Sequence, residues 1–285
     1  MPSVAVVGAG SMASFLVRAL SASGYTISEI ILRPEAGAES ARRAHKLART
    51  AGAKVVTAEK AALKAALIWF CVPDREIKKA AAAIAARVAR STARRYAFHS
   101  SGALLSGELA SLRKAGWGVA SVHPLMTFVE GEQPLLRGVP FALEGDPAAT
   151  RLARRIVRDL GGQSLPLALR HKAAYHAWAT MTSPLLVAYL VALERAAYQA
   201  GLSPRRARQM SAPIIRQTLS NYGKRGPAKS FSGPLIRGDA ATVAKHLKLL
   251  KKQSATRDVY IALARLALTH LPSRNRAELR RLLNS

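Results

Sequence analysis

The stretch VAVVGAGSMASFLVRAL, residues 4–20, decides the fold of the N-terminal half of the chain. An apolar run ends at Gly8 and Gly10, and a helical pattern follows at once. Strand, glycine turn and helix in this order match G-x-G-x-x-A, in which Gly8 permits the tight turn, Gly10 lets the backbone approach a pyrophosphate, and Ala13 keeps helix and strand close. We therefore expect a dinucleotide to bind at the turn residues, Gly8, Ala9, Gly10, Ser11, Met12 and Ala13.

The order of predicted elements gives the fold class. Short β-like runs alternate with helical patterns up to residue 168, which predicts βαβ units and a mostly parallel, Rossmann-like sheet. Helical periodicity dominates afterwards, with one helix expected over residues 172–200 and an irregular Gly- and Pro-rich stretch at 223–239. The prediction is an α/β domain at residues 1–168 followed by an all-α domain at residues 169–285.

Composition favours a cytoplasmic protein. The single cysteine, Cys71, excludes a disulfide framework within the chain and a cysteine-cluster zinc site, and it suits a reducing compartment. The apolar residues 4–17 lack the basic flank of a signal peptide. The uncharged segment at 177–193 contains Pro184 and falls short of the roughly 20 residues that cross a bilayer. We interpret it as a core or interface helix and expect no membrane partner.

The charge of the chain is strongly positive, with 44 basic and 16 acidic residues and a formal net charge of +28. Such a field attracts anions and favours non-specific nucleic-acid binding. The cations are nevertheless dispersed along helical patterns, as in Arg151, Arg154, Arg155 and Arg158, without interleaved aromatic residues. We expect an anionic small-molecule substrate and no specific nucleic-acid partner.

The end of the second predicted strand indicates which dinucleotide is bound. NAD enzymes usually place an acidic residue there to accept hydrogen bonds from the ribose hydroxyls. Here the strand ends at Arg33, and Arg42 and Arg43 follow in the next helical pattern. A guanidinium attracts the 2′-phosphate of NADP, which a carboxylate repels, so NADP is favoured over NAD. NAD remains the alternative because of Glu35, whose carboxylate could accept the hydrogen bonds of the ribose hydroxyls.

Three predicted strands end in polar residues, and the carboxyl ends of parallel strands meet at one edge of a sheet. The endings are FCVPDREI at 70–77, FHSSGALL at 98–105 and SVHPLMTF at 121–128. His99, Ser101 and His123 become candidates for binding or proton transfer, because imidazole can donate and accept protons near neutral pH. Ser101 could instead cap a helix, and Asp74 is expected to be a helix N-cap. We expect cofactor contacts from Val72, Pro73 and Ser100, and the spacing suggests no metal site.

Seven motifs together resemble one protein family. The chain is similar to two-domain NADP-binding proteins of the 6-phosphogluconate-dehydrogenase-like superfamily, and more closely to a family whose C-terminal half is domain of unknown function 2520. More distantly, residues 179–207 resemble the helical domain of pyrroline-5-carboxylate reductases, and SVHPL resembles a segment of prephenate dehydrogenases. The motifs are VVGAGSMA, CVPDREI, FHSSGAL, SVHPLMTF, FALEGD, YHAWATM and SGPLIRGDAATVAKHL.

The resemblance implies a Rossmann domain, a helical dimerisation domain and a reductase-like site. Hydroxyacid dehydrogenases of the superfamily carry a Lys, with an Asn four residues later, at the start of the second domain. Here Lys172 matches the Lys, but His176 stands four residues later in place of the Asn. Helical spacing places Lys172, His176 and Ser183 along one stripe. His176 is the first candidate for proton transfer and Lys172 the second, whereas a purely structural His176 remains the alternative.

A loop in the second half offers a further substrate contact. In SGPLIRGD, Arg237 could hold a substrate carboxylate, and Asp239 is expected to cap the following helix.

The sequence leads to one preferred function and two alternatives. The preferred one is an NADP-dependent oxidoreductase acting on a carbonyl or imine, with Ser101, His123, Lys172 and His176 as catalytic candidates and His99, Ser183 and Arg237 as substrate-binding candidates. The alternatives are a non-catalytic NADP-binding sensor or scaffold and a basic nucleic-acid-binding protein.

Overall fold

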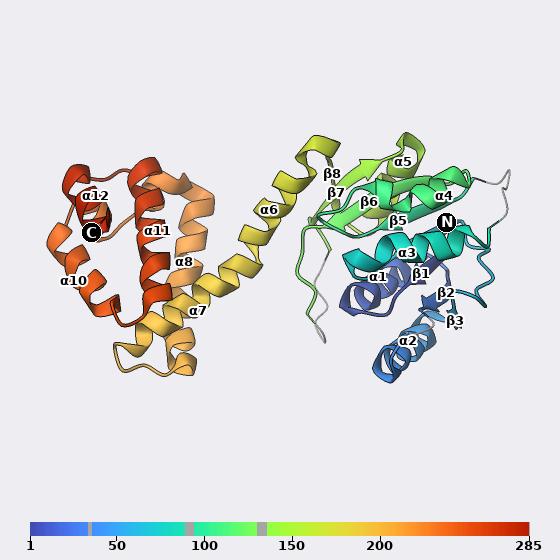
Figure 1. The fold of residues 1–285 in the computed structure, drawn as a ribbon, viewed down its shortest axis with the longest axis horizontal. Coiled ribbons are helices and arrows are strands. Elements are labelled where there is room, and N and C mark those ends of the chain that lie inside the picture. The colour runs from blue at the N-terminus through green and yellow to red at the C-terminus, as the bar shows by residue number, and fades with distance from the viewer. Residues whose placement is uncertain (34–35, 89–93, 130–135, 285) are drawn as a thin grey trace. The chain divides into compact units, whose positions relative to one another are not determined.

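The structure is a computed structural model that describes residues 1–33, 36–88, 94–129 and 136–284. It contains two compact units, Met1–Thr180 and Met181–Ser285 (Figure 1). The first unit is built on a sheet and the second is entirely helical across its described residues. The predicted fold class is therefore confirmed.

The first unit is organised around one sheet, in which eight strands are found among the described residues, in the order β3-β2-β1-β4-β5-β6-β7-β8. Neighbouring strands pair in parallel, except for the antiparallel pair β6 and β7. The strands are β1 (Val4–Val7), β2 (Ile27–Leu32), β3 (Lys54–Thr57), β4 (Leu67–Phe70), β5 (Tyr96–His99), β6 (Gly118–Pro124), β7 (Pro140–Gly145) and β8 (Gln163–Pro166).

Helices cover both faces of the sheet, which is why its central strands read as continuous apolar runs. Successive side chains of a strand point to opposite faces. Val4 and Val6 accordingly pack in one core cluster with α1, α2 and α5, whereas Ala5 and Val7 pack in another with α3, η1 and α4. These helices are α1 (Ser11–Ala22), α2 (Ala38–Ala51), α3 (Asp74–Ala85), η1 (Ser106–Leu109), α4 (Ala110–Lys114) and α5 (Pro147–Asp159).

The strand order reverses between β1 and β4, since the chain moves outward from β1 to β2 and β3 and then returns to β4 on the other side. Ligands of open α/β sheets bind beyond the carboxyl ends of the strands at such a point. The carboxyl ends of β1, β4, β5 and β6 therefore define where a functional site is expected.

The second unit has a small core made by three of its helices. Val243 and Leu247 of α10 pack with Ile261 and Leu268 of α11 and with Leu279 of α12. Its helices are α7 (Pro184–Tyr198), α8 (Pro204–Ser230), α9 (Pro234–Arg237), α10 (Ala240–Leu250), α11 (Ser254–His270) and α12 (Arg276–Asn284).

Two sequence-based expectations for the helical half are wrong. The helix expected over residues 172–200 is interrupted at Ser183, which has φ −126° and ψ −73°, so α6 (Lys172–Thr182) and α7 are separate. Proline at the first position of α7 suits a new helix start. The stretch expected to be irregular is largely helical, because α8 continues to Ser230 across a non-helical Gly226.

The contact-based boundary between the units follows Thr180, twelve residues beyond the predicted boundary after residue 168 (180 − 168 = 12). The short helix η2 (Leu169–His171) and most of α6 belong to the first unit. Lys172 and Tyr175 are buried there and bond to residues of β6. These long-range contacts attach the start of the helical half to the sheet.

Candidate active site

The glycine turn has the geometry expected of a dinucleotide cradle. Gly8 has φ +108°, and a Cβ there would lie 2.4 Å from the carbonyl oxygen of Cys71. Gly10 precedes α1, and a Cβ there would meet no atom within 4 Å. Gly8 is thus required by the neighbouring strand, whereas Gly10 leaves open space in front of the helix. Ala13 is fully buried beneath the turn.

The start of α1 suits an anionic group. Its first turn contains no acidic residue, and no side chain caps its amides. Helix N-terminal amides and the helix dipole favour phosphate. Ala9 is buried and Met12 packs partly against the core, so Ser11 is the turn side chain that lines an adjacent groove. The residues of the turn therefore fit the pyrophosphate of a dinucleotide.

Arg33 follows β2, and its guanidinium lies 3.1 Å from the carboxylate of Glu76 in α3. Its side chain is 44% exposed, so it remains accessible to a ligand. A hollow of about 170 Å³ lies beside this ion pair, with an apolar wall that includes Leu32, Ala80 and Ile84. The hollow could hold an adenine ring, with Arg33 at its rim. Glu35 lies outside the described residues.

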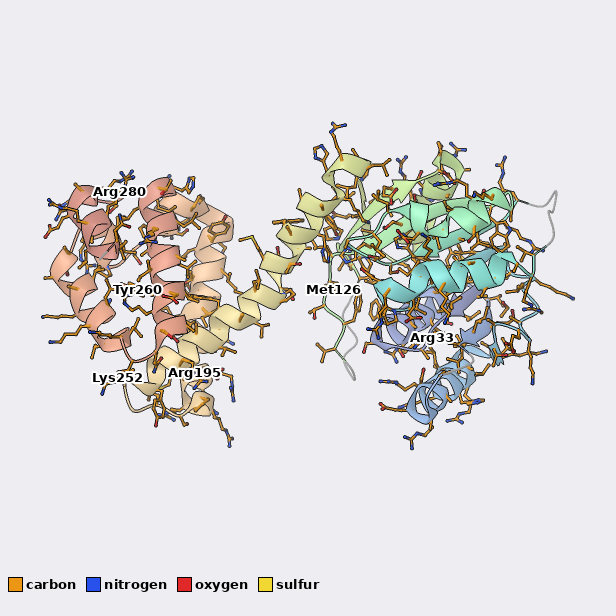
Figure 2. All side chains as sticks on the ribbon, in the orientation of Figure 1. Arg33, Met126, Arg195, Lys252, Tyr260 and Arg280 are labelled. Carbon is orange, nitrogen blue, oxygen red and sulfur yellow. The ribbon has the colours of Figure 1, made fainter. Side chains whose placement is uncertain are left out.

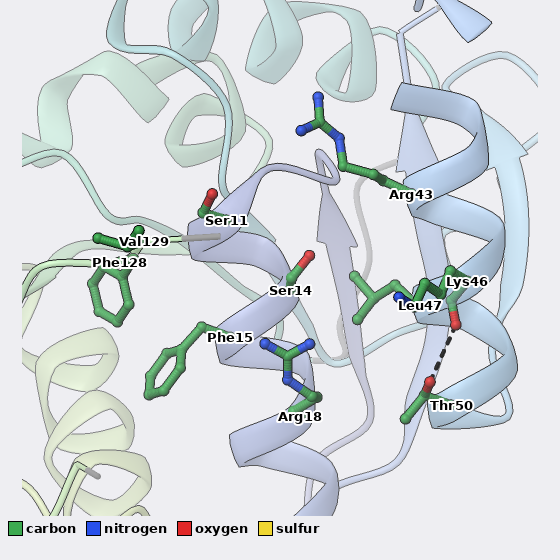
Figure 3. A pocket seen from close by; sticks show the side chains of 10 residues that line it. All are labelled: Ser11, Ser14, Phe15, Arg18, Arg43, Lys46, Leu47, Thr50, Phe128 and Val129. Atoms are coloured by element: carbon green, nitrogen blue, oxygen red, sulfur yellow. Dashed lines mark hydrogen bonds between the residues drawn. The ribbon is translucent and has the colours of Figure 1, made fainter. Parts of the chain in front are cut away.

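A cationic groove of about 250 Å³ runs between α1 and α2. Arg18, Arg43 and Lys46 line it, and none of its described lining residues is acidic. Figure 3 shows the Arg43 guanidinium pointing from α2 toward the start of α1, where Ser11 lies. Arg42 is exposed and does not line this groove. Of the neighbouring residues Arg42 and Arg43, Arg43 is therefore the one that lies on the same side of α2 as the glycine turn.

The turn after β5 is held by His99, which is fully buried. Its Nδ1 accepts a hydrogen bond from the Ser101 amide at 3.1 Å, so its Nε2–H donates to the Leu105 carbonyl at 3.0 Å. Burial lowers the pKa of His99 to about 4. Both ring nitrogens are therefore engaged, and the neutral imidazole shapes the loop.

Ser101 connects this turn to α3. Its hydroxyl donates to Asp74 at 2.8 Å and accepts from the amides of Ala103 and Leu104 at 3.2 and 2.9 Å. Asp74 is not the expected N-cap, because Pro73 holds that position and the carboxylate binds Ser101 instead.

The residues expected to border the cofactor follow the ends of neighbouring strands. Ser100 accepts a hydrogen bond from the Trp69 indole at 2.9 Å. Val72 and Pro73 follow β4, and the Val72 side chain borders Gly8.

Lys172 brings a buried cation to the middle of β6, at the level where β5 ends. It is 2% exposed, and its ammonium donates to the Ser121 hydroxyl at 2.6 Å. Ser121 in turn donates to the Ser101 carbonyl at 3.2 Å. Burial lowers the pKa of Lys172 to about 8, although the charges of Glu144 and Asp74 oppose this shift. The pKa of Lys172 thus lies much closer to neutral pH than that of an exposed lysine.

Two imidazoles converge on Gly102. A Cβ on this glycine would lie 2.6 Å from Cδ2 of His176 and 2.9 Å from Nε2 of His123. The Nδ1 of His123 lies 2.8 Å from the hydroxyl of Tyr175. Burial, followed by the charges of Lys172, His176 and His99, lowers the pKa of His123 to about 4. Three catalytic candidates, His123, Lys172 and His176, are thereby gathered around the Ser101 turn.

The pKa of Lys172 predicts a pH-dependent stability. Because the folded pKa is about 8 and the ordinary value 10.5, the unfolded chain binds more protons between these pH values. The free energy of unfolding should therefore rise with pH there, by roughly 1–2 kcal/mol between pH 8 and 9.5. Urea unfolding at these pH values measures the effect. Lys172→Met should remove this part of the rise, and an unchanged pH dependence in the variant would contradict the assignment.

Two substrate-binding candidates belong to the second unit. Ser183 lies at the break before α7, so the helical stripe from Lys172 does not extend to it. Arg237 ends α9, and Asp239 caps α10 as expected, accepting from the Thr242 amide at 2.9 Å. Among the described residues, no group of three His, Cys, Asp or Glu side chains is placed to hold a metal ion.

Sequence reasoning missed Tyr175 and Gly102 as site residues, and it named Arg42 and Arg43 together, of which Arg43 lines the groove. Tyr175 precedes the predicted His176, and Gly102 follows the predicted Ser101, but their contacts join β6 and α6 across the fold. The signal that could have found Tyr175 is helical spacing: it lies three residues after Lys172 and shares its buried face.

The fold and the glycine turn define a two-domain protein with a Rossmann-like first domain. Residues 3–92 match the family described as NADP oxidoreductase coenzyme F420-dependent, and residues 139–267 match Domain of unknown function (DUF2520). The chain is therefore similar to that oxidoreductase family in its N-terminal part and to DUF2520 in its C-terminal part, which confirms the resemblance predicted from the motifs. A comparison with curated proteins gives no significant match.

Solved structures share the fold over nearly the whole chain. A proposed NADP oxidoreductase from Bacteroides fragilis has a TM-score of 0.74 at 20% identity, covering 93% of this chain and 96% of that one. An imine reductase from Myxococcus stipitatus in complex with NADP⁺ has a TM-score of 0.64 at 16% identity, covering 94% of each chain. A pyrroline-5-carboxylate reductase from Coxiella burnetii has a TM-score of 0.58 at 15% identity, covering 93% and 97%.

One helical stretch of the described chain, Leu169–Tyr198, is long and apolar enough to cross a membrane by length and composition alone. The same criteria are met by helices of soluble folds. Because the solved structure from Bacteroides fragilis shares the fold over 93% of this chain, we interpret this stretch as part of that shared fold rather than as a membrane span.

Proposed function

We propose that the protein is an NADP-dependent oxidoreductase that transfers a hydride to or from a carbonyl or imine carbon of a small anionic substrate. One observation carries this proposal. A single compact unit holds both a dinucleotide-type glycine turn and the cluster of His123, Lys172 and His176, of which Lys172 is buried, at the same edge of its sheet. The bound cofactor would supply the hydride chemistry, for which the chain provides binding and proton transfer.

The cofactor would be held along the carboxyl ends of β1, β2 and β4. The amides after Gly10 suit the pyrophosphate, and the hollow beside Arg33 suits the adenine. Val72, Pro73 and Ser100 follow neighbouring strands and are placed to border the rest of the dinucleotide.

Proton transfer would be the task of His176, with Lys172 as the second candidate. His176 lies at the convergence over Gly102 and is only partly buried, so it can exchange protons with solvent. General acid–base catalysis requires hydrogen-bond reach to the reacting group and a suitable pKa. Ser101, with its hydroxyl in three hydrogen bonds, would shape the loop that presents these groups.

The positive charge of the chain favours an anionic substrate, with Arg237 and Ser183 as the candidates from the second unit. Figure 2 shows basic side chains spread around both units. We also infer a homodimer formed through the helical domain, because α7 exposes large apolar side chains, among them Leu185, Val187 and Val191. The proposed enzyme would act in the cytoplasm, on a small molecule and without a specific nucleic-acid partner.

The preference for NADP is tested at Arg33. Arg33→Ala should weaken NADPH binding about tenfold and leave NADH binding nearly unchanged, because only NADPH presents a 2′-phosphate to the guanidinium. Competition with Glu76 for the same guanidinium places this effect at the low end of the range for a charge-assisted bond. The measurement is a fluorescence titration with both cofactors.

Arg49→Ala is the matched control, since Arg49 is an exposed arginine in the last turn of α2. It should bind both cofactors as the wild type does. Absence of NADPH binding to the wild type would overturn the oxidoreductase proposal, and tight binding without turnover of any carbonyl or imine would favour a sensor. Equal weakening for NADPH and NADH would remove Arg33 as the phosphate contact.

A further inference from the structure

We propose that Tyr175 fixes His123 as the Nε2–H tautomer, and that the site therefore accepts a carbonyl rather than an iminium as its reacting group. The inference rests on the proposed oxidoreductase function for its chemistry, but its first step concerns only the chain itself. Tyr175 is here a positioning residue, and His123 is the residue that would touch substrate.

The direction of the Tyr175–His123 hydrogen bond follows from hydrogen-bond satisfaction. Tyr175 is 6% exposed, and its hydroxyl has no other partner among the described residues than Nδ1 of His123, 2.8 Å away. If Nδ1 carried the proton, the hydroxyl would accept it and leave its own O–H buried and unpaired, which costs roughly 1–3 kcal/mol. The tyrosine therefore donates, and the proton of the neutral imidazole lies on Nε2.

The Nε2 end of His123 faces Gly102, where a Cβ would come within 2.9 Å. Within the described part of the chain, no protein atom hydrogen-bonds this nitrogen. His99 makes the contrast clear, because both of its ring nitrogens are bound within the loop. His123 thus offers one free N–H donor beside His176, at the edge of the sheet where ligands bind.

The charge around this donor decides what it can bind. Burial keeps the pKa of His123 near 4, so its imidazole is neutral at neutral pH, and Lys172 of α6 adds a positive charge beside it. An iminium carries a positive charge and an N–H donor. Its N–H would face the Nε2–H donor of His123, and its charge would be repelled by the ammonium of Lys172. A carbonyl oxygen has lone pairs that accept the Nε2–H bond, and the bond strengthens as negative charge develops on the oxygen.

A bound reduced nicotinamide would supply the hydride, and its ring would be oxidised as its C–H bond breaks and the new C–H bond of the substrate forms. The π pair of the C=O bond would move to oxygen, and this oxygen would take a proton from His176. His176 regains a proton from water. Throughout the step, His123 keeps its proton and stabilises the oxygen through the Nε2–H bond.

The experiment is nitrogen-15 NMR of the histidine side chains in the full chain, comparing the wild type with Tyr175→Phe. We expect a fixed Nε2–H tautomer for His123 in the wild type and a mixture of tautomers in the variant. The matched control is Tyr260→Phe, because Tyr260 makes the equivalent bond to Nδ1 of His246 in the other unit, at 3.1 Å. It should leave the His123 signals unchanged. A wild-type His123 protonated at Nδ1, or a tautomer unaffected by Tyr175→Phe, would overturn the inference.

Turnover with NADPH tests the substrate class. The probes are a series of 2-oxo acids and the cyclic imine 1-pyrroline-2-carboxylate. We expect faster turnover of the 2-oxo acids, and Tyr175→Phe should lower their kcat/KM about 10- to 100-fold. Faster reduction of the imine would overturn the carbonyl assignment. Failure of NADPH to bind would overturn the proposed function instead, and the NMR result would still decide the tautomer.

Discussion

Gly8→Ala should destabilise the protein by about 3 kcal/mol or more, whereas Gly10→Ala two residues later should leave its stability nearly unchanged. An alanine at position 8 must adopt the left-handed φ of +108° and place its Cβ 2.4 Å from the Cys71 carbonyl oxygen. That oxygen belongs to the backbone after β4, which is fixed by its pairing with β1 and cannot yield easily. Urea unfolding at pH 7 measures the difference between the two variants.

Gly10→Ala should instead weaken cofactor binding, with the affinity for NADPH lowered 100-fold or more. Gly10 has φ −75°, which alanine adopts readily, and no atom of the chain lies within 4 Å of the added methyl group. The methyl group would occupy the space where the backbone must approach a pyrophosphate. Normal stability with lost NADPH binding separates the ligand's requirement from that of the fold. Retained NADPH affinity in Gly10→Ala would place the dinucleotide elsewhere.

The fold was predictable because its signals are local. The four residues of β1 are all buried, and they are followed directly by the glycine turn and an apolar-faced helix, so the βαβ order could be deduced from the sequence. The break at Ser183 and the helical continuation to Ser230 were not deduced. At Ser183 the apolar pattern continues across the break, so the sequence shows no boundary. Before Ser230, Gly226 and Pro227 are residues typical of loops, but the residues around them are helical.

The site was predictable only in part, because its residues meet through tertiary contacts. A strand end indicated His123, and the resemblance to hydroxyacid dehydrogenases of the superfamily indicated Lys172 and His176. No sequence pattern shows that the Tyr175 hydroxyl reaches His123, 52 positions away, or that Glu76 pairs with Arg33. Glycine at position 102 looks like ordinary loop composition until two imidazoles are placed against it.

Gly102→Ala should lower kcat by at least about 100-fold at a modest cost in stability. The added Cβ would lie 2.6 Å from Cδ2 of His176 and 2.9 Å from Nε2 of His123, so both imidazoles must move. Side chains can rotate away where backbone cannot, so we expect a loss of stability of roughly 1–3 kcal/mol. The two imidazoles proposed to act in catalysis would then be displaced by roughly half an ångström or more, and such misplacement is costly for proton transfer and orientation.

Gly107→Ala is the matched control for this effect, because Gly107 lies in η1, five residues further along the same loop region, and a Cβ there meets no atom within 4 Å. It should keep wild-type kcat and stability. Steady-state turnover of the 2-oxo acids with NADPH reports a catalytic effect in the two variants, and urea unfolding reports a structural one. A Gly102→Ala enzyme with wild-type kcat would mean that the convergence of His123 and His176 is packing alone, and the chemistry would then have to be assigned to Lys172.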